Sequence, residues 1–197
     1  MDRYNISILV VDGVGFKPYI KICRALDIPF AMRTDNDIFE KTVKKIEYYY
    51  YAGISRVVGI YKELISSSSD DLILKYWDNN KKKNQWLKTK NVTKGAQALN
   101  KAIRKKLEKF NIYLSDVDLE NDIVNTKLYD SLSSYYETTK KQEIIKLMQS
   151  KKAEHMLDYL MYLIDNNISM NIIENDNICK PLKELKELVS KGVSSNE

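Results

Sequence analysis

Three aspartates follow two short segments: Asp12 comes directly after the apolar run 6–11 (ISILVV), Asp35 comes directly after 29–34 (PFAMRT), and Asp37 comes two residues after Asp35. Carboxylates two residues apart beyond a strand end can reach one ion if the backbone turns there, and Mg²⁺ prefers such hard oxygen ligands. Asp35 and Asp37 are therefore candidate ligands for Mg²⁺ or Mn²⁺. Asp12 can lie near them if the two segments are neighbouring strands of one sheet. A turn or a helix cap is the alternative explanation of an Asp-x-Asp sequence in a loop.

Other catalytic chemistries have few residues to draw on. His155 is the single histidine, which excludes an HExxH zinc motif and leaves little room for a Ser-His-Asp triad. Cys23 and Cys179 are far apart and have no Cys or His neighbour at metal-ligand spacing, so neither a zinc site nor a disulfide framework is indicated. Any chemistry must use carboxylates and lysines.

The segment around these aspartates predicts a strand–helix–strand unit. The β-branched run 6–11 is typical of a buried parallel strand, and FKPYIKICRALDI at 16–28 has apolar residues close to helical spacing. Pro29 ends that helix, and 29–34 is a second strand. Parallel strands bring their C-terminal ends to one sheet edge, which is where open α/β sheets bind ligands.

The rest of the chain predicts a mainly helical α/β protein. We expect a partial parallel sheet flanked by helices, with a core at 1–130 and a helical C-terminal part of the same domain at 131–197. The expected elements are, in chain order, long helical character at 39–65, a break at 66–71, an irregular basic loop at 72–91, a helix at 93–110, a strand at 112–115 and helices at 139–149, 152–165 and 180–190.

Positive charge is concentrated in one segment. Residues 81–109 hold eleven Lys or Arg against the single Glu108, a net charge of +10, so the remainder of the chain sums to −5. Such a block suits a polyanion, because lysines near phosphates displace condensed counterions. A solvated loop and helix face is the alternative. The candidate DNA-binding residues are Lys81, Lys82, Lys83, Lys88 and Lys90, with Trp77 and Trp86 as candidate stacking surfaces.

The stretch from Val11 to Asp37, VDGVGFKPYIKICRALDIPFAMRTDND, resembles the middle of a Toprim domain of the OLD (overcoming lysogenization defect) nuclease family. The shared order is a strand, a glycine turn, a helix, and a strand that delivers a DxD motif. The resemblance implies that Asp35 and Asp37 are metal ligands. It is specific over residues 8–37, and the order of later elements also fits.

The same resemblance implies further site residues later in the chain. A later acidic motif of the family corresponds to DLEND at 118–122, with Glu120 as the metal ligand and Asp116 or Asp118 as alternatives. A family lysine corresponds to Lys152 or Lys151, and we favour Lys152. Against these roles, Glu120 also suits the first turn of a helix, and lysines are common on surfaces.

The chain departs from the family pattern at its beginning. Family members carry a first-strand glutamate and an ATPase domain ahead of the segment seen here, and no GxxxxGK[ST] motif occurs. We therefore expect a fragment, a split-gene product or a truncated relative.

The leading functional hypothesis is a Mg²⁺-dependent (or Mn²⁺-dependent) DNA endonuclease module, similar to the nuclease subunit of the Gabija anti-phage system. It would nick DNA and be incomplete on its own. The alternative is a non-catalytic truncated Toprim module that binds nucleic acid or a partner protein. Expected partners are DNA, the ATPase portion of an OLD-type protein, a helicase-like protein and a second copy. We expect a cytoplasmic protein with no membrane association, since no apolar run reaches roughly 18 residues.

Overall fold

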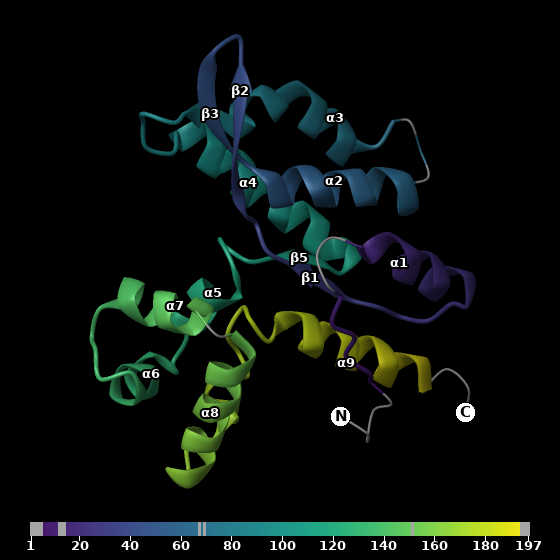
Figure 1. Ribbon diagram of the computed structural model, residues 1–197. Helices are drawn as coiled ribbons and strands as arrows, with labels where there is room; N and C mark the ends of the chain where they lie inside the picture. The colour runs from purple at the N-terminus through teal and green to yellow at the C-terminus, as the bar shows by residue number, and fades with distance from the viewer. Residues whose placement is uncertain (1–5, 12–14, 67, 69, 151, 194–197) are drawn as a thin grey trace. The chain divides into compact units, whose positions relative to one another are not determined.

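The computed structural model of the protein describes residues 6–11, 15–66, 68, 70–150 and 152–193 (Figure 1). The chain forms two compact units. Unit 1 comprises Met1–Leu114 and Pro181–Glu197, and unit 2 comprises Ser115–Lys180. The fold is mixed α/β, with a parallel strand pair and a separate antiparallel sheet, which confirms the expected fold class. The division into domains at residue 130 stays a prediction.

The parallel pair places the candidate site. Strands β1 (Met32–Thr34) and β5 (Ile112–Leu114) lie side by side, with Met32 opposite Ile112 and Thr34 opposite Leu114. Helix α1 (Phe16–Ala25) precedes β1. The predicted helix after Gly15 and the predicted strands near 29–34 and 112–115 are therefore confirmed.

The expected first strand at 6–11 is wrong. These residues have no regular secondary structure, and Ile8, Leu9 and Val10 are 59%, 62% and 84% exposed. β-Branched residues favour a strand only where a neighbouring strand supplies hydrogen-bond partners and a surface to pack against. Among the described residues, β1 pairs with β5 and not with 6–11. The predicted βαβ unit is consequently absent from this part of the chain.

A β-hairpin replaces the first half of the helical segment predicted at 39–65. Strands β2 (Ile38–Val43) and β3 (Ile46–Tyr51) pair antiparallel, and β4 (Gln85–Leu87) adds to β3. The correction has a physical reason, because Ile, Phe, Thr, Val and consecutive tyrosines pack well on a pleated sheet. Helix α2 (Ala52–Leu64) begins only where β3 ends.

The basic segment is also more regular than predicted. The expected loop at 72–91 contains helix α3 (Leu72–Asn80), the 3₁₀ turn η2 (Lys81–Asn84) and β4. Asp71 caps α3, since its Oδ1 accepts from the Ile73 and Leu74 amides at 2.7 and 3.1 Å. The predicted helix near 93–110 is confirmed as α4 (Lys94–Leu107), followed by the 3₁₀ turn η3 (Glu108–Phe110).

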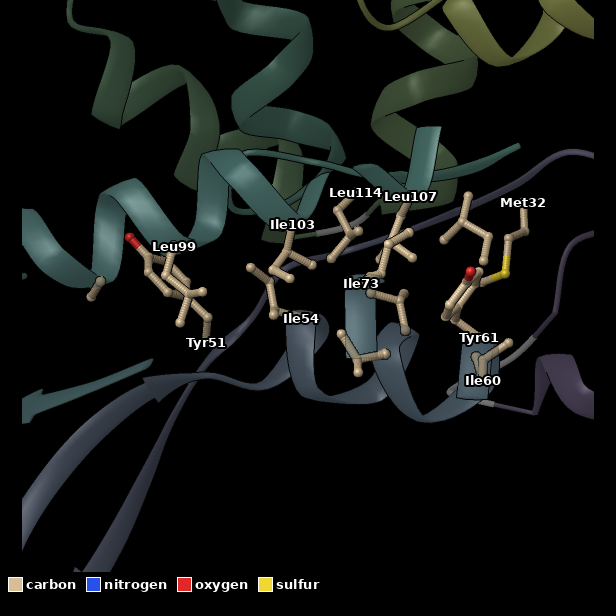
Figure 2. Close-up of a cluster of buried hydrophobic side chains, with 14 of the residues drawn as sticks. Met32, Tyr51, Ile54, Ile60, Tyr61, Ile73, Leu99, Ile103, Leu107 and Leu114 are labelled. Carbon is tan, nitrogen blue, oxygen red and sulfur yellow. The ribbon is translucent and has the colours of Figure 1, made fainter. Parts of the chain in front are cut away.

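The core of unit 1 lies between α2 and α4 (Figure 2). Side chains at helical spacing on each helix point toward the other and are almost fully buried. β1 and β5 close one side of this cluster. The buried side chains labelled in the figure include Ile54, Ile60 and Tyr61 from α2, Leu99, Ile103 and Leu107 from α4, and Met32 and Leu114 from the strands.

Unit 2 is a helical assembly with its own core. It contains α5 (Leu119–Val124), α6 (Tyr129–Tyr135), α7 (Lys141–Ser150), α8 (Lys152–Asp165) and the 3₁₀ turn η4 (Met170–Ile173). Its buried cluster includes Val124, Leu132, Ile144, Met148 and Leu163. Helix α9 (Lys180–Val193) follows unit 2 in the chain and, from Pro181 on, belongs to unit 1. The three predicted C-terminal helices are thus confirmed. No helix in the described ranges is both long and apolar enough to cross a bilayer.

Asp71 couples α3 to α2 through its second oxygen, which accepts from the Tyr61 hydroxyl at 2.5 Å and from Ser66 Oγ at 3.1 Å. Partial burial of the carboxyl opposes its ionisation, but hydrogen bonds from Tyr61, the Leu74 and Ile73 amides and Ser66 hold the pKa of Asp71 below its ordinary value. Stability from this group is therefore present above the unfolded-state pKa near 4 and is lost as the pH falls through the lower folded-state value.

We predict that Asp71→Ala lowers the free energy of unfolding by about 1–2 kcal/mol at pH 7, because the helix cap and the tyrosine contact are both lost. Denaturant unfolding at pH 7 and at pH 2.5 measures it, and the difference from the parent protein should narrow at the lower pH. Asp70→Ala is the matched control, since that side chain is 83% exposed and forms a surface ion pair with Lys75. An equal loss at both pH values would contradict the prediction.

Candidate metal site after strand β1

The loop Asp35–Asp37 leaves the C-terminal end of β1 and leads into β2. Burial alternates from Thr34 to Asp37: Thr34 and Asn36 are buried, whereas Asp35 and Asp37 are partly exposed. The side chain between the two carboxylates is therefore anchored in the protein interior. Such an arrangement leaves both acidic residues on the solvent-accessible side of the loop, as a site for a cation requires.

The first turn of α2 holds this loop by hydrogen bonds. The Ala52 amide donates to the Asp37 carbonyl at 2.8 Å, and the Ile54 amide donates to Asn36 Oδ1 at 3.2 Å. A helix begins with amides that have no partner in the helix itself. The preceding residue, Tyr51, provides no side-chain cap for α2. The loop after β1 therefore caps the helix from 15 or more residues away in sequence.

Gly53 permits this close approach. A Cβ atom at this position would lie 2.4 Å from the Asp35 carbonyl oxygen and 2.5 Å from the Asn36 Cα. Both neighbours are backbone atoms that cannot rotate out of the way. Any side chain here would push the acidic loop away from α2, so glycine is required for the contact.

Arg56, one turn further along α2, ties the strand end to the second carboxylate. Its Nη1 donates to Thr34 Oγ1 at 2.9 Å, and its Nη2 lies 3.3 Å from Asp37 Oδ2. The Arg56 side chain is 17% exposed, so the guanidinium is held between two partners in a partly desolvated position. Together with the positive end of α2, it gives the acidic loop a locally positive surrounding.

The donor set fits a hydrated Mg²⁺ rather than a tightly caged ion. Asp35 and Asp37 offer hard oxygen atoms, and Mg²⁺ is commonly bound by one or two carboxylates while waters and substrate phosphates fill the other positions. No group of three or more His, Cys, Asp or Glu side chains suited to a metal occurs among the residues that the structure describes. Metal binding here would consequently depend on water and on phosphate oxygens.

The other predicted acidic residues belong to unit 2. Glu120 lies in the first turn of α5 and is only 4% exposed. Asp118 is the N-cap of that helix, since its Oδ1 accepts from the Asn121 amide at 2.8 Å, and its Oδ2 accepts from Gln149 Nε2 at 2.8 Å. Asp118 thus has a structural role in this unit. The assignment of Glu120 as a metal ligand stays a prediction.

The candidate lysines lie in different parts of the protein, and two of the predicted residues are outside the described ranges. Lys152 is the first residue of α8, in unit 2, whereas Asp12 and Lys151 lie outside the described residues. In the basic segment, Lys81, Lys82 and Lys83 are exposed on η2, and Lys90 is exposed after β4. Lys81 pairs with Asp78 at 2.7 Å. Lys88 is different, because it forms ion pairs with Glu40 at 2.8 Å and Glu47 at 3.6 Å.

Sequence reasoning missed Asn36, Gly53 and Arg56. Asn36 stands between two candidate ligands and has no predicted role, and the other two residues lie inside 39–65, a segment with long helical character that the tyrosine run and Gly53 interrupt. A signal did exist for Gly53, because a glycine near the start of a helix often marks a close backbone approach. Nothing in the sequence indicates that Arg56 faces Asp37.

Comparison with known proteins supports the same region. The family model described as overcoming lysogenization defect protein-like, TOPRIM domain, matches residues 1–37. The match supports a Toprim domain of OLD type. It ends at the second aspartate of the acidic loop, and it covers less than a fifth of the chain. Toprim domains generally bind Mg²⁺ and hydrolyse nucleic acids. A search of curated proteins finds no match to the chain.

We predict that Gly53→Ala destabilises the protein by about 1–3 kcal/mol, because its methyl group overlaps the backbone of the acidic loop. Gly59→Ala, in the same helix, is the matched control. A Cβ at Gly59 has no neighbour within 4 Å, so this change should stabilise by about 0.5–1 kcal/mol through helix propensity alone. Urea unfolding of the three proteins measures both effects. A neutral Gly53→Ala would show that the loop can move away from α2 without loss.

Proposed function

We propose that this chain is the metal-dependent DNA endonuclease module of an OLD-family anti-phage protein similar to the Gabija nuclease subunit, and that it nicks DNA. The observation that carries the proposal is the loop after β1, which holds Asp35 and Asp37 at a strand end inside the segment matched by the Toprim family model. DNA is the proposed substrate. The ATPase portion of an OLD-type protein, a helicase-like protein and a second copy are the proposed partners.

Each residue of the loop has a part in the proposed hydrolysis. A bound Mg²⁺ or Mn²⁺ supplies a polarised phosphate and an activated water. Asp35 and Asp37 would hold the ion, and the buried Asn36 between them anchors the loop on α2 by accepting from the Ile54 amide. Arg56 pairs with Asp37 at 3.3 Å and would contribute positive charge toward a phosphate bound at this loop. Glu120, as a further ligand, and Lys152 or Lys151, as a cation that would offset charge in the transition state, stay predictions from the family resemblance. Glu120 and Lys152 belong to unit 2, and Lys151 lies outside the described residues.

A specific observation favours the second candidate, a non-catalytic module that binds nucleic acid or a partner protein. The Asp37 carboxylate already has a cation at 3.3 Å, and a metal ion must share it with Arg56. Two carboxylates also provide fewer negative ligands than two ions about 3.5–4 Å apart generally need. The endonuclease candidate cuts DNA and requires divalent metal and Asp35 to do so, whereas the non-catalytic module binds without cutting.

We predict weak Mn²⁺ and Mg²⁺ binding that requires the acidic loop. Isothermal calorimetry on the parent protein should give a binding heat that disappears in Asp35→Asn/Asp37→Asn, since both charged ligands are removed. Asp27→Asn is the control because Asp27 is an exposed residue of the same unit. Its backbone φ of 51° suits asparagine, so the change should not disturb the fold. Equal heats in all three proteins would remove the loop as a metal site.

Nicking of supercoiled plasmid separates the two candidate functions. The endonuclease proposal expects slow Mn²⁺-dependent nicking by the chain alone, a strong rise when an OLD-type ATPase portion is added, and loss of both in Asp35→Asn. Nicking that is absent in every combination, with DNA binding retained, would favour the non-catalytic module.

We predict that the exposed lysines of η2 contact DNA phosphates. Lys81→Ser/Lys82→Ser/Lys83→Ser should flatten the slope of log affinity against log salt by up to about 3 for duplex DNA, because each phosphate contact contributes about 0.9. The control removes the same charge elsewhere in unit 1, with Lys17→Ser/Lys21→Ser/Lys62→Ser on α1 and α2. Filter binding across salt concentrations measures the slopes. Identical slopes for both triple variants would show that the change follows net charge alone and that the η2 lysines make no specific phosphate contacts.

A further inference from the structure

The antiparallel sheet β2–β3–β4 has one face packed on the core and one face without core contacts. Tyr51 and Trp86 point inward and are 7% and 5% exposed, with ring centroids 5.1 Å apart. Side chains alternate along a strand, so their neighbours in sequence point to the opposite face. The residues of this outer face are Phe39, Lys41 and Val43 on β2, Ile46, Tyr48 and Tyr50 on β3, and Gln85 and Leu87 on β4.

The outer face carries the aromatic side chains of Phe39, Tyr48 and Tyr50. Phe39 is 50% exposed and lies opposite Tyr50, with an edge-on ring contact of 6.5 Å between centroids. Tyr48 lies two residues before Tyr50 on the same face, and both tyrosines are half-buried. The Lys41 ammonium lies over the Tyr50 ring at 5.3 Å from its centroid. Rings and a cation therefore share one exposed surface, on a hairpin that projects beyond α2 and α3 (Figure 1).

Charge is separated between the two faces of this hairpin. The acidic residues Glu40 and Glu47 alternate onto the inner face, where both pair with Lys88. A hydrogen bond from Lys88 lowers the pKa of Glu40, so this carboxylate stays ionised and paired. On the outer face of β2 and β3 the charged strand residue is Lys41. The outer face therefore combines aromatic surface with positive charge only.

The turn of the hairpin adds two more cations in an unfavourable backbone conformation. Lys44 and Lys45 connect β2 to β3 with φ angles of 50° and 68°. Two-residue hairpin turns of this kind favour Asn-Gly, because L-residues with side chains rarely adopt positive φ. Strained positions of this sort are concentrated at functional sites. The two lysines make the turn less stable than Asn-Gly would, and they place positive charge at the tip of the aromatic face.

We propose that this face, defined by Phe39, Lys41, Tyr48, Tyr50 and the turn lysines Lys44 and Lys45, binds single-stranded nucleic acid. Bases stack on the exposed Phe39 ring and on the accessible parts of the half-buried Tyr48 and Tyr50 rings, and phosphates contact the lysines. Exposed aromatic groups combined with positive charge suit unpaired strands, since every base has a face that can stack once it is free of a duplex. The site is separate from the acidic loop and needs no metal. It extends the proposed function by assigning a preference for unpaired over duplex strands.

Fluorescence anisotropy in EDTA with a labelled oligothymidylate tests the proposal, because metal-dependent cutting cannot contribute. The parent protein should bind it more tightly than a duplex of equal length. Phe39→Leu and Tyr48→Leu keep apolar surface and remove the ring, and each should weaken binding by about 5-fold or more. Thr42→Val on the inner face is the matched control and should bind like the parent. Asp35→Asn should also bind normally, which keeps this test independent of the endonuclease proposal.

Lys44→Asn/Lys45→Gly tests the charges without a risk of misfolding, because these residues suit the turn better than lysine does. This variant should keep the fold by circular dichroism and reduce the salt slope for the single strand by about 1.4. An oligouridylate of the same length shows whether the strand is DNA or RNA. Equal affinity for duplex and single strand, or unchanged binding in both ring variants, would overturn the proposal. So would dimer dissociation by the ring variants in sedimentation, which would assign the face to self-association.

Discussion

The hydrogen bond from the Ile54 amide to the buried side chain of Asn36 is the contact on which the candidate site depends. It satisfies an amide at the start of α2 that has no partner within the helix, and it fixes the residue between the two candidate ligands. Removal of either partner would leave a buried polar group without its bond, which is costly in a protein interior. The helix and the acidic loop therefore stabilise each other.

This mutual dependence explains why α2 starts where it does. Tyr51 ends β3 and gives the helix no side-chain cap, so its start requires an acceptor from elsewhere in the chain. The loop after β1 supplies a carbonyl and an amide oxygen at that point. Gly53 then allows the two backbones to meet. One short contact region thus joins the parallel pair, the hairpin and the main core helix of unit 1.

Sequence reasoning succeeded where a local pattern decides the structure. Strand β5 and helices α1 and α4 follow from apolar spacing, and the position of Asp35 after a strand was predicted for the same reason. It failed where a distant partner decides. The run 6–11 has the composition of a strand but is not paired, and the tyrosines before α2 join a sheet that exists only because β2 and β4 flank β3. The role of Arg56 depends on tertiary contacts in the same way.

The pairing of β1 with β5 has a consequence for how the protein folds. Met32 and Ile112 are neighbours in space but are separated by the hairpin, α2, α3 and α4 in sequence. Contacts between distant segments form late, because the entropy of closing a long loop must be lost first. The contact between the acidic loop and α2 closes a far shorter loop. During synthesis, we expect the acidic loop to dock on α2 before β5 has emerged from the ribosome. The loop that holds Asp35 and Asp37 would then take its shape before β1 pairs with β5.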